Sequence, residues 1–392
     1  MEKHVFIVGS KGIPANYGGY ETFLEYLTQG QQDTAIKYHV ACKVTNKTAA
    51  KQKHFMHNHA DCFNVYVPNI GPAQAIYYDV AALNQAIRYA RRHRIKKPIF
   101  YILACRIGPF MRDITRRVHA IGGVVYVNPD GHEWMRAKWS KPVRQYWKYS
   151  EGLMVKHADL LICDSKNIEH YIQTTYAQYQ PKTTFIAYGA GIQKSTLADD
   201  GLEIVDWFKQ FNIHANDYYL IVGRFVPENN YETMIREFMA SESKKDLVII
   251  TNVEHNQFYD TLKAKTHFEQ DQRIKFVGTV YNQDLLSKIR ELAYGYLHGH
   301  SVGGTNPSLL EALASTKLNL LFDVGFNREV GEDSTLYWSK QAGALADLIE
   351  RADELSAAEI EQLDQKSTQR ITDDYSWPFI VGEYEKEFLE AN

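Results

Sequence analysis

Four loops of this sequence place glycine, arginine or closely spaced titratable residues directly after β-branched runs. In the first of them, Gly18 and Gly19 come just before a helix pattern, and the free backbone N–H groups of a helix start attract phosphate. The loop is neither G-x-G-x-x-G nor a P-loop, because two residues separate Gly9 from Gly12 and no GK[ST] follows. It therefore indicates either a phosphate contact outside the ordinary nucleotide motifs or a tight strand-to-helix turn.

The second loop lies in the stretch HGHSVGGTNPSLLEAL, which runs from a strand pattern into a helix pattern. Pro307 is well placed as the first helical residue, so that backbone donors before it point out of a helix start. Glu311 then lies within the helix, about a turn below a bound phosphate, where a carboxylate can accept from a sugar hydroxyl. On its own this is a weak indication, because a glutamate inside a helix is usually a solvated or ion-paired residue. The residues that precede Pro307 are Gly303, Gly304, Thr305 and Asn306.

Arg224 is the charged residue of the third loop, VGRFVPENNYE, which follows the first strand pattern of the second half. A guanidinium at the end of a parallel strand is a good phosphate ligand, because its planar fork binds two oxygens at once. Asn229 and Asn230, later in the same loop, are candidates for capping the helix that follows.

The fourth loop, VNPDGHEWMRAKWSKP, holds Asp130, His132 and Glu133 close together after a strand pattern. Three neighbouring titratable groups suit acid–base chemistry or the orientation of a hydroxyl group. An Asp-Gly pair alone would predict only a turn, and the company of His132, Glu133 and two tryptophans favours the functional interpretation. Asp164, in ICDSKN, follows another strand and carries the same expectation, with capping of the next helix by Asp164 or Ser165 as the alternative.

Alternating strand and helix patterns position these loops. Short β-branched runs such as HVFIVG, PIFYILA and YYLIVGR alternate with helix patterns in both halves, which predicts an α/β fold with two doubly wound, mostly parallel sheets. Parallel sheets bind ligands beyond the carboxyl ends of their strands, which is where all four loops lie. The break falls near YGAGIQKSTLAD, and we expect an N-terminal domain over 1–190, a second domain over 191–374 and a terminal helix over 375–392.

Charge divides the chain where the domains divide. Residues 1–195 hold 26 Lys and Arg against 13 Asp and Glu, whereas the remainder holds 18 against 34. A basic half suits an anionic surface or a diphosphate, and attraction between the two halves is the alternative. The cysteines are scattered without a CxxC pair, and neither a signal peptide nor a long apolar run is present, which predicts a cytoplasmic protein that does not span a membrane.

With these loops in view, the chain resembles glycosyltransferase family 4, retaining nucleotide-sugar enzymes of the GT-B fold, over essentially its whole length. Gly18, Gly19, Arg224 and Glu311 occupy the places of that family's Gly-Gly loop, donor-domain arginine and second glutamate of Glu-x7-Glu. More narrowly, GSKGIPANYGGYETF, YVNPDGHEWMRAKWSKP, GRFVPENNYET and HGHSVGGTNPSLLEAL are similar to streptococcal-type dTDP-rhamnose β-1,4-rhamnosyltransferases of lipid-linked polysaccharide synthesis. The resemblance implies two Rossmann-like domains that face a cleft, with the terminal helix crossing back to the first domain.

Two departures from the general family pattern bear on the donor sugar. Gly303 stands where the first glutamate of Glu-x7-Glu would be, and Asn229 replaces the usual lysine. In the family that glutamate accepts hydrogen bonds from the hydroxyls of the donor sugar, so its absence removes an interaction worth roughly 1.5–3 kcal/mol. The resemblance implies dTDP-β-L-rhamnose, a deoxysugar donor, in place of a glucose-type donor.

The resemblance also implies a role for each candidate residue. Glu311 would hold the deoxyribose hydroxyl, and Asp130 with His132 would be the catalytic candidates at the reacting centre, where the leaving diphosphate assists deprotonation of the acceptor. Backbone N–H groups and arginine can neutralise the diphosphate, so neither a metal nor another cofactor is expected. The donor site would comprise Gly18, Gly19, Arg224, Asn229, Thr279, Val280, His300, Gly303, Gly304, Thr305, Asn306 and Glu311. The acceptor site would comprise Tyr17, Glu21, Glu133 and Asp164.

Residues 134–149 combine five bases with five aromatic residues and no acid, a composition that suits contact with an anionic membrane surface. A second basic cluster, RYARRHRIKK at 88–97, has the same sign. The alternative is that the aromatic residues form the core face of a helix over 141–157. Nucleic-acid binding is disfavoured, because no recognition motif accompanies the charge.

Two groups of histidines have a spacing that could serve a site. The stretch HFMHNHADC has metal-like spacing, but nothing elsewhere completes a zinc site, and a surface loop without metal is the favoured interpretation. His298 and His300 alternate on a strand and share a face, which predicts lining of the donor site, with core packing as the alternative.

The charge and composition predict a cytoplasmic enzyme, peripheral on the inner face of the cell membrane, and the resemblance implies that it moves L-rhamnose to a saccharide on undecaprenyl diphosphate. GlcNAc is the favoured saccharide. A family-4 transferase with a UDP-sugar donor is the first alternative, and a nucleotide-sugar epimerase on the same fold is the second. A catalytically inactive glycan-binding scaffold is disfavoured because the loops are intact, and the oligomeric state is not predicted.

Overall fold

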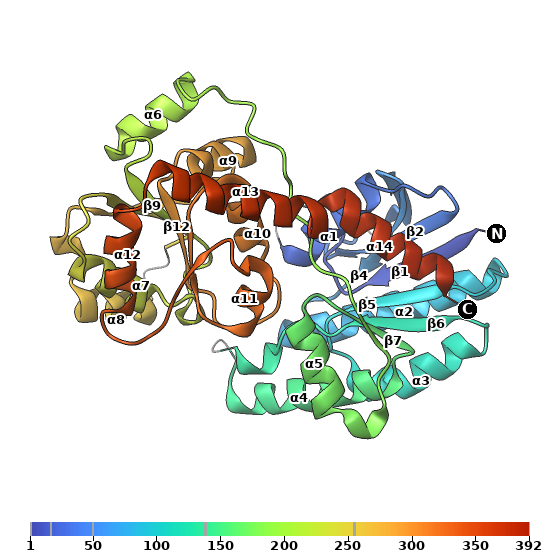
Figure 1. Ribbon diagram of the computed structural model, residues 1–392. Helices are drawn as coiled ribbons and strands as arrows, with labels where there is room; N and C mark the ends of the chain where they lie inside the picture. The colour runs from blue at the N-terminus through green and yellow to red at the C-terminus, as the bar shows by residue number, and fades with distance from the viewer. Residues whose placement is uncertain (1, 16–17, 49–50, 137–138, 254–255, 392) are drawn as a thin grey trace. The chain divides into compact units, whose positions relative to one another are not determined.

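Two parallel sheets organise the chain in the computed structural model, which describes residues 2–15, 18–48, 51–136, 139–253 and 256–391 (Figure 1). Contacts divide the chain into unit 1, Met1–Gly189 with Trp377–Asn392, and unit 2, Ala190–Ser376. The domain boundaries expected from the sequence lie close to these. Among the described residues, no helix combines the length and the apolar composition that a membrane span needs.

Unit 1 is built on an eight-stranded sheet with the order β3-β4-β2-β1-β5-β6-β7-β8. The pairs are parallel except for β3 with β4. Central strands such as β5, IFYIL, are buried along their whole length, as expected when helices cover both faces. The strands are β1 (Lys3–Val8), β2 (Ile36–Val44), β3 (His54–His57), β4 (Ala60–Tyr66), β5 (Ile99–Leu103), β6 (Val124–Asn128), β7 (Leu160–Cys163) and β8 (Thr183–Phe185).

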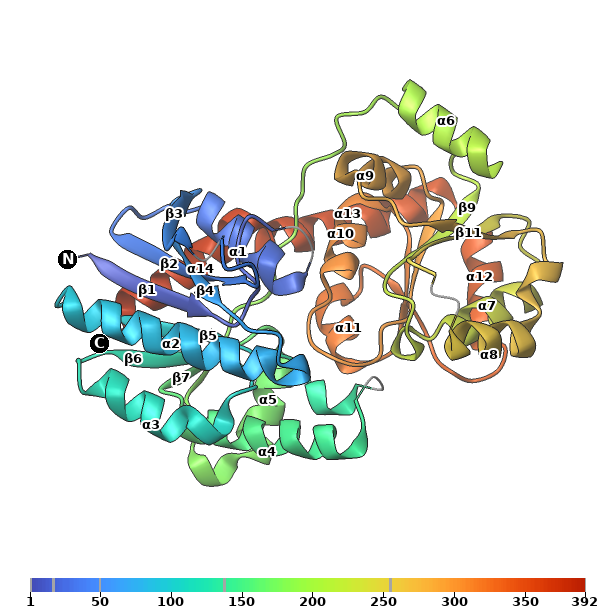
Figure 2. The same ribbon diagram turned by 180° about the vertical axis from the view of Figure 1, so that it is seen from behind.

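Helices lie on both faces of this sheet (Figures 1 and 2). Phe100 and Ile102 of β5 share a core with α2 and α3, whereas Tyr101 between them meets Tyr384 and Phe388 of α14. Since successive strand residues point to opposite faces, α14 covers the face opposite α2 and α3. The terminal helix therefore packs on unit 1, as expected. The helices are α1 (Gly19–Gln29), α2 (Gln74–Arg92), α3 (Gly108–His119), α4 (Lys141–His157), α5 (Lys166–Thr175) and α14 (Trp377–Glu390).

Unit 2 repeats the scheme with a six-stranded, wholly parallel sheet of order β11-β10-β9-β12-β13-β14. One core lies under α7 and α12, and a second lies under α6 and α9. The strands are β9 (Tyr218–Val222), β10 (Asp246–Ile250), β11 (Ile274–Gly278), β12 (Gly295–His298), β13 (Asn319–Phe322) and β14 (Leu336–Trp338). The helices are α6 (Leu202–Phe211), α7 (Tyr231–Ala240), α8 (Gln257–Thr266), α9 (Gln283–Glu291), α10 (Pro307–Ser315), α11 (Gly325–Gly331), α12 (Ala344–Asp353) and α13 (Ala357–Asp374).

The histidine-rich stretch before β4 is a strand, and the loop predicted there from the sequence is wrong. Strand β3 pairs antiparallel with β4 at the edge of the sheet. Its histidines are engaged with carboxylates: His54 Nδ1 lies 3.0 Å from Asp61 Oδ1, and His57 Nε2 lies 2.6 Å from Glu25 Oε1. Within the described ranges, no group of three or more His, Cys, Asp or Glu side chains is arranged to hold a metal ion.

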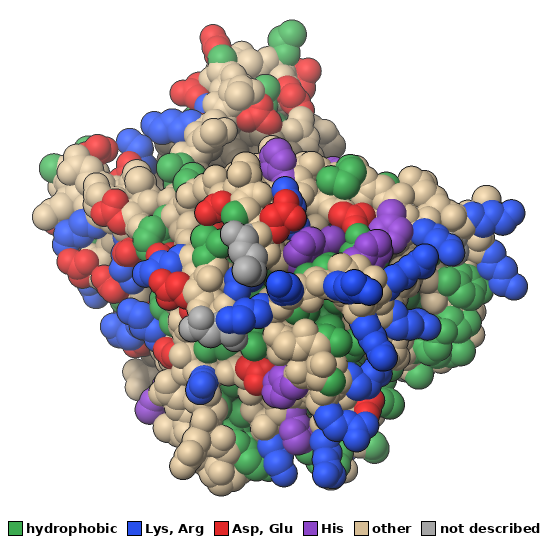
Figure 3. Space-filling view, turned by 90° about the vertical axis from the view of Figure 1, so that its right-hand side faces the viewer, with side chains coloured by type: hydrophobic (Ala, Val, Ile, Leu, Met, Phe, Trp, Pro, Cys, Tyr) green, Lys and Arg blue, Asp and Glu red, His purple; other side chains and the backbone are tan. Residues whose placement is uncertain are grey.

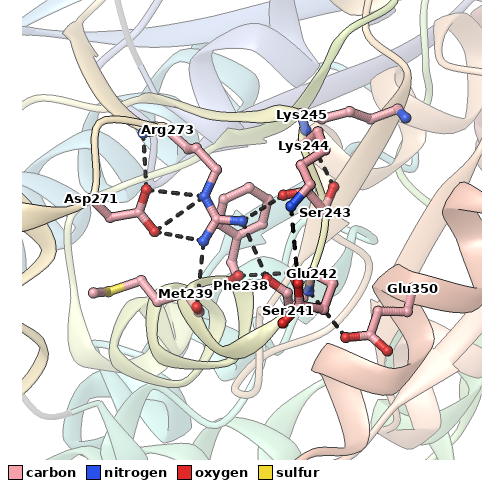
Figure 4. A network of polar contacts seen from close by, with 10 residues as sticks. All are labelled: Phe238, Met239, Ser241, Glu242, Ser243, Lys244, Lys245, Asp271, Arg273 and Glu350. Atoms are coloured by element: carbon pink, nitrogen blue, oxygen red, sulfur yellow. Dashed lines mark hydrogen bonds and ion pairs between the residues drawn. The ribbon is translucent and has the colours of Figure 1, made fainter.

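An arginine closes the carboxyl end of α7 in unit 2 (Figure 4). Arg273 Nη1 donates to the carbonyls of Ser243 at 2.6 Å and Ser241 at 3.2 Å, and Nη2 donates to Asp271 Oδ2 at 2.6 Å. The guanidinium also lies over Phe238, 5.0 Å from the ring centroid. The last carbonyls of a helix have no partner inside it, so Arg273 stabilises this end of α7 and the segment that leads to β10.

Arg273→Ala is expected to lower the free energy of unfolding by about 2 kcal/mol, because a charged donor with several buried acceptors is lost. The hydrogen bond from Arg273 holds the pKa of Asp271 below its usual value. That contribution is present above the unfolded pKa of Asp271 and is lost as the pH falls through the lower folded pKa. Urea unfolding measures the change, with the exposed Lys263→Ala as the control. Equal loss of stability in both variants would contradict the assignment.

Candidate functional site

Two carboxylates of α1 hold the loop that follows β1. Glu21 Oε1 accepts from the backbone N of Lys11 at 2.5 Å, and Glu25 Oε2 accepts from that of Ala15 at 2.8 Å. Gly18 has φ +130°, and a Cβ there would lie 1.9 Å from Glu21 Oε2, so only glycine fits. Glu21 is buried against this loop and braces it, which differs from its expected place in an acceptor site.

The neighbouring Gly19 has nothing within 4 Å of the position that a Cβ would take. It begins α1, so there is open space beside this helix start, and the phosphate contact expected at the Gly18-Gly19 pair stays a prediction. Tyr17, expected in the acceptor site, lies outside the described residues.

Arg106, which no sequence pattern singled out, follows β5 at the same carboxyl edge of the sheet. Its Nε lies 3.0 Å from Asp79 Oδ2, and its Nη2 donates to the carbonyls of Gly9 and Leu103. Asp79 is fully buried on α2, and burial raises its pKa to about 6 although Arg106 opposes the shift. The pair ties α2, β5 and the loop after β1 together. A single Asp within the apolar stripe of the α2 pattern was the signal that could have revealed it.

Asp130 and His132 lie just beyond the carboxyl end of β6, and both have a left-handed backbone, with φ +57° and +47°. Asn, Asp and His adopt this conformation more readily than other side chains, but it still costs about 1 kcal/mol or more and clusters at active sites. The backbone N of Asp130 donates to Asn128 Oδ1 at 2.8 Å. Asp130 Oδ1 accepts from the N of Gly131 at 2.9 Å and lies 3.7 Å from Arg136 Nη2. The loop thus holds the Asp130 carboxylate in one orientation.

Glu133, in the same loop, is committed to its own neighbours. Its Oε2 lies 2.5 Å from Arg136 Nε, and its Oε1 accepts from Trp139 Nε1 at 2.9 Å. The residue is buried. Glu133 therefore braces the short helix Glu133–Met135, which differs from its expected role in binding an acceptor.

Asp164 shares a neighbour with Asp130 at this edge. Burial, followed by the charges of Asp130 and Asp164, raises the pKa of Tyr20 well above its usual value. Tyr20 lies on α1, so the ends of β6 and β7 and the start of α1 converge there. Ser165, rather than Asp164, caps α5, with its side chain accepting from the N of Asn167 at 3.1 Å.

Most aromatic residues of 134–149 are used inside unit 1. The rings of Trp139 and Trp147 lie 6.1 Å apart, and Tyr146 Oη donates to the carbonyl of Arg106 at 2.8 Å. Tyr149, by contrast, is 62% exposed. The composition that suggested a membrane contact therefore owes much to packing around the site.

Hydrogen bonds to backbone carbonyls join the two site loops of unit 2, which follow β9 and β12. Ser301 N and Oγ donate to the carbonyl of Glu228 at 3.1 and 2.7 Å, and Asn230 Nδ2 donates to that of Gly299 at 2.6 Å. Asn230 has φ +55° and makes no side-chain cap, so the predicted capping of α7 is wrong. A Cβ on Gly299 would lie 2.3 Å from the carbonyl oxygen of Asn229, which leaves room for glycine alone. The loops after β9 and β12 form one surface.

The two positions that depart from the family pattern, 229 and 303, meet at His300. Asn229 Nδ2 donates to the carbonyl of Arg224 at 2.8 Å, which leaves Asn229 Oδ1 to accept from His300 Nδ1 at 2.9 Å. The Nδ1 of His300 is therefore the donor in this pair, and in the neutral form of the ring Nε2 is the acceptor nitrogen. Gly303 has φ +128°, and a Cβ there would lie 3.3 Å from His300 Nε2. A glutamate at position 303 would therefore be strained and would crowd this ring.

Helix α10 begins as the sequence predicted. Asn306 Oδ1 accepts from the N of Ser308 at 2.9 Å, and Pro307 is the first helical residue. Glu311 is 39% exposed and its Oε2 lies 2.7 Å from Nη2 of Arg290, which is buried at 3% exposure. The ion pair holds the carboxylate in place while part of it faces solvent. Nothing in the local sequence of α9 indicated Arg290 as its partner.

The remaining donor candidates differ in exposure. Thr279, just after β11, is exposed, whereas Val280 packs against the core beneath α9. His298 is buried, and burial lowers its pKa well below the usual value, so that the ring is neutral. Its ring lies 6.0 Å from that of His300, in keeping with the shared face, but the burial of His298 favours the packing interpretation.

Comparisons with known proteins identify the fold. A family model described as a domain of unknown function, DUF1972, matches residues 2–191, just under half of the chain. No curated protein matches the sequence. Among solved structures, sucrose-phosphate synthase from Thermosynechococcus elongatus aligns with a TM-score of 0.75 at 16% identity and covers 100% of both chains. The chain has the GT-B fold.

Two further structures of this fold align over nearly the whole chain. Anabaena Alr3699/HepE in complex with UDP has a TM-score of 0.70 at 14% identity, covering 99% of this chain and 100% of its own. The Escherichia coli trehalose-6-phosphate protein bound with UDP-2-fluoro glucose has a TM-score of 0.72 at 11% identity, covering 99% of each chain. At these identities the likeness establishes the fold and leaves the chemistry to the residues of the site.

Proposed function

We propose that this protein is a retaining glycosyltransferase that moves L-rhamnose from dTDP-β-L-rhamnose to a saccharide carried on undecaprenyl diphosphate. Unit 2 supplies the donor loops: Arg224 and the start of α10 bind the diphosphate, and Glu311, held by Arg290, accepts from the sugar of the nucleotide. Unit 1 supplies Asp130 and His132 for the acceptor hydroxyl. The GT-B fold and the placement of these residues at the carboxyl edges of their sheets support this assignment.

One observation carries the choice of donor: the contact of Asn229 and Gly303 with His300. A charged Lys and Glu at positions 229 and 303 would suit the hydroxyl groups of a glucose-type sugar. Here an imidazole acceptor stands beside a glycine in a left-handed conformation. Such a surface offers fewer hydrogen bonds to a sugar, which suits a deoxysugar with a methyl group in place of a hydroxymethyl group.

Asp130 and His132 have the properties that the acceptor step requires. Burial lowers the pKa of His132, so the ring is neutral near pH 7 and can accept a hydrogen bond. The fixed Asp130 carboxylate orients the acceptor hydroxyl, and the leaving diphosphate assists its deprotonation. Arg224 and backbone N–H groups offset the charge of the diphosphate, and no metal is assigned to the reaction.

A UDP-sugar donor is the second candidate. The structure of Anabaena HepE was solved with UDP and with UDP-glucose, and the E. coli protein carries UDP-2-fluoro glucose. Both share the fold of this chain. A competition assay between dTDP-rhamnose and UDP-glucose separates the two candidates.

His300→Ala is expected to lower kcat/KM for dTDP-rhamnose about tenfold, the worth of one good hydrogen bond in a transition state. Because His300, held by Asn229, is assigned to the sugar and not to the nucleotide, affinity for free dTDP should change little. His214→Ala, an exposed histidine elsewhere in unit 2, is the control. A preference for UDP-glucose in the wild-type protein would reject the rhamnose assignment in favour of the second candidate.

We further propose that the outer face of α2 and α3 contacts the membrane that carries the acceptor. Arg117 Nη1 on α3 donates to Asn84 Oδ1 on α2 at 2.7 Å, so these outer faces adjoin. Tyr77 and Phe110, near the two helix starts, are 44% and 45% exposed. Figure 3, which views the end of unit 1 where the chain termini lie, shows Lys and Arg side chains gathered there. The exposed bases of the two helices are Arg88, Arg91, Arg92, Arg112 and Arg116.

The double variant Arg88→Glu with Arg91→Glu is expected to weaken binding to vesicles that contain anionic lipid by at least tenfold. Each base near an anionic leaflet contributes about 1 kcal/mol, and charge reversal replaces attraction by repulsion. Neither side chain pairs with a carboxylate among the described residues. Vesicle sedimentation measures the effect, with Lys209→Glu plus Lys244→Glu in unit 2 as the charge-matched control. Equal binding of both variants would reject this face.

A further inference from the structure

A lysine of α4 lies inside an aromatic cage behind the Asp130–His132 loop. Lys148 Nζ lies 4.7 Å from the ring centroid of Trp134, 4.8 Å from that of Tyr171 and 5.0 Å from that of Tyr176. Ammonium groups are attracted to the faces of aromatic rings, most strongly where water is excluded. The cage therefore joins α4, α5 and the segment after His132.

Glu151, one turn further along α4, closes this cluster. Its Oε1 accepts from Tyr171 Oη and from Tyr176 Oη, each at 2.5 Å, and lies 3.3 Å from Lys148 Nζ. The side chain of Glu151 is only 5% exposed. A carboxylate this deeply buried would be costly without such partners, so the cluster is a built arrangement with opposite charges side by side.

The cluster touches the site through one ring. The ring of Tyr171 lies 4.1 Å from that of His132, and Trp134 meets the same imidazole edge-on at 6.0 Å. His132 has a left-handed backbone and is flanked by Asp130 two residues before it. The hydroxyl of Tyr171 is anchored by Glu151, so the surface against which the imidazole rests is fixed from α4.

We propose that Glu151 and Lys148 are positioning residues for His132, acting through the ring of Tyr171. Neither residue is assigned a contact with a substrate. Glu151 anchors Tyr171, Lys148 balances the buried carboxylate, and the imidazole is held in one orientation beside Asp130. The consequence for transfer rests on the proposed function, whereas the coupling to His132 is a property of unit 1 alone.

The charges that face His132 act in opposite directions. Burial lowers the pKa of the imidazole, Glu151 raises it and Lys148 lowers it further. Tyr171 contributes a neutral ring from α5, and Asp130 and Glu133 are the carboxylates of the loop itself. Removal of Glu151 or Lys148 should therefore change the titration of His132 in opposite senses.

The test is an NMR titration of the His132 imidazole in the full-length protein. We expect Lys148→Met to raise the pKa of His132 and Glu151→Gln to lower it. Lys156→Met, which removes an exposed lysine of α4 that lies over Tyr179, should leave the pKa of His132 unchanged. If Glu151→Gln fails to fold, Lys148→Met and Tyr171→Phe still test the proposal, since Tyr171→Phe keeps the ring and loses only the hydroxyl with its contacts to Glu151 and Lys148. An unchanged titration in Lys148→Met overturns the proposal.

Kinetics provides the second readout. Tyr171→Phe and Lys148→Met should lower kcat about tenfold or more and leave the KM for the donor unchanged, because only the orientation of His132 is disturbed. If the variants instead raised the KM for the donor and left kcat unchanged, the positioning role would be overturned. If the titrations shift as expected but the wild-type protein transfers no sugar, the proposed function fails while the coupling to His132 stands.

Discussion

Asp130→Asn is expected to reduce kcat by about 100- to 10,000-fold, the range over which positioned acid–base groups act. The substitution keeps the side-chain oxygen that accepts from the N of Gly131 and removes only the charge. The loop should therefore keep its shape, with its left-handed residues intact. Donor binding should be unchanged, because Asp130 is assigned to the acceptor hydroxyl and not to the donor.

Steady-state rates with the donor and a synthetic lipid-linked acceptor measure this effect. Asp113→Asn, an exposed aspartate on α3 in the same unit, is the control and should retain full activity. Isothermal titration of the nucleotide separates a loss of catalysis from a loss of binding. Full activity in Asp130→Asn would remove Asp130 from the catalytic machinery.

Asp79→Leu is expected to destabilise unit 1 by roughly 3–5 kcal/mol, the usual consequence of leaving one member of a buried ion pair without its partner. Arg106 cannot simply turn to solvent, because its Nη2 donates to the carbonyls of Gly9 and Leu103. The unpaired guanidinium would remain among buried groups beneath the loop after β1. Urea unfolding measures the loss, and Asp113→Leu on the exposed side of α3 is the control. A loss no larger than that of the control would contradict the account.

The pH dependence of stability tests the same pair. Burial raises the pKa of Asp79 to about 6, above its ordinary 3.8, so the folded protein binds this proton more tightly than the unfolded chain does. The contribution of this group to stability is therefore complete below the ordinary value and is lost as the pH rises through about 6. Asp79→Asn should remove that part of the pH dependence, which unfolding curves across this range would show.

Local signals predicted much of the fold. Helix α10 begins with an Asn cap and a Pro in the first turn, both visible in the sequence. The buried strands are continuous apolar runs, and the helix patterns between them fix parallel order. Strand β3 escaped detection because it is a short edge strand whose histidines resemble a loop or a metal motif. Its pairing depends on β4 rather than on its own composition.

The site was less predictable, because its support comes from residues distant in sequence. Asp79 with Arg106 and Arg290 with Glu311 join different elements. The lone Asp in the apolar stripe of α2 hints at a buried charge, but no local pattern names the partner in either pair. Glu21 was expected to meet an acceptor, yet its carboxylate satisfies a backbone N–H of the loop after β1. Charged residues near a site predict where chemistry occurs, but only packing decides which of them face it.

His300 shows how the sequence and the structure together connect the two departures from the family pattern. The sequence marked positions 229 and 303 as departures from a family pattern, without a reason to connect them. The structure joins both to one imidazole, Asn229 by a hydrogen bond and Gly303 by the space that a side chain would need. The effects of substitutions at positions 229 and 303 should therefore not be additive, because both positions act through the His300 ring.

The central claim is transfer of a deoxyhexose from a dTDP-sugar, and one measurement tests it most directly. The purified protein is incubated with dTDP-rhamnose, UDP-glucose and GDP-sugars in turn, together with a synthetic GlcNAc diphosphate lipid, and the product mass is read. We predict a deoxyhexosyl adduct that forms with dTDP-rhamnose and is lost in Asp130→Asn. A hexosyl adduct from a UDP-sugar, or no adduct from any donor, would contradict the account.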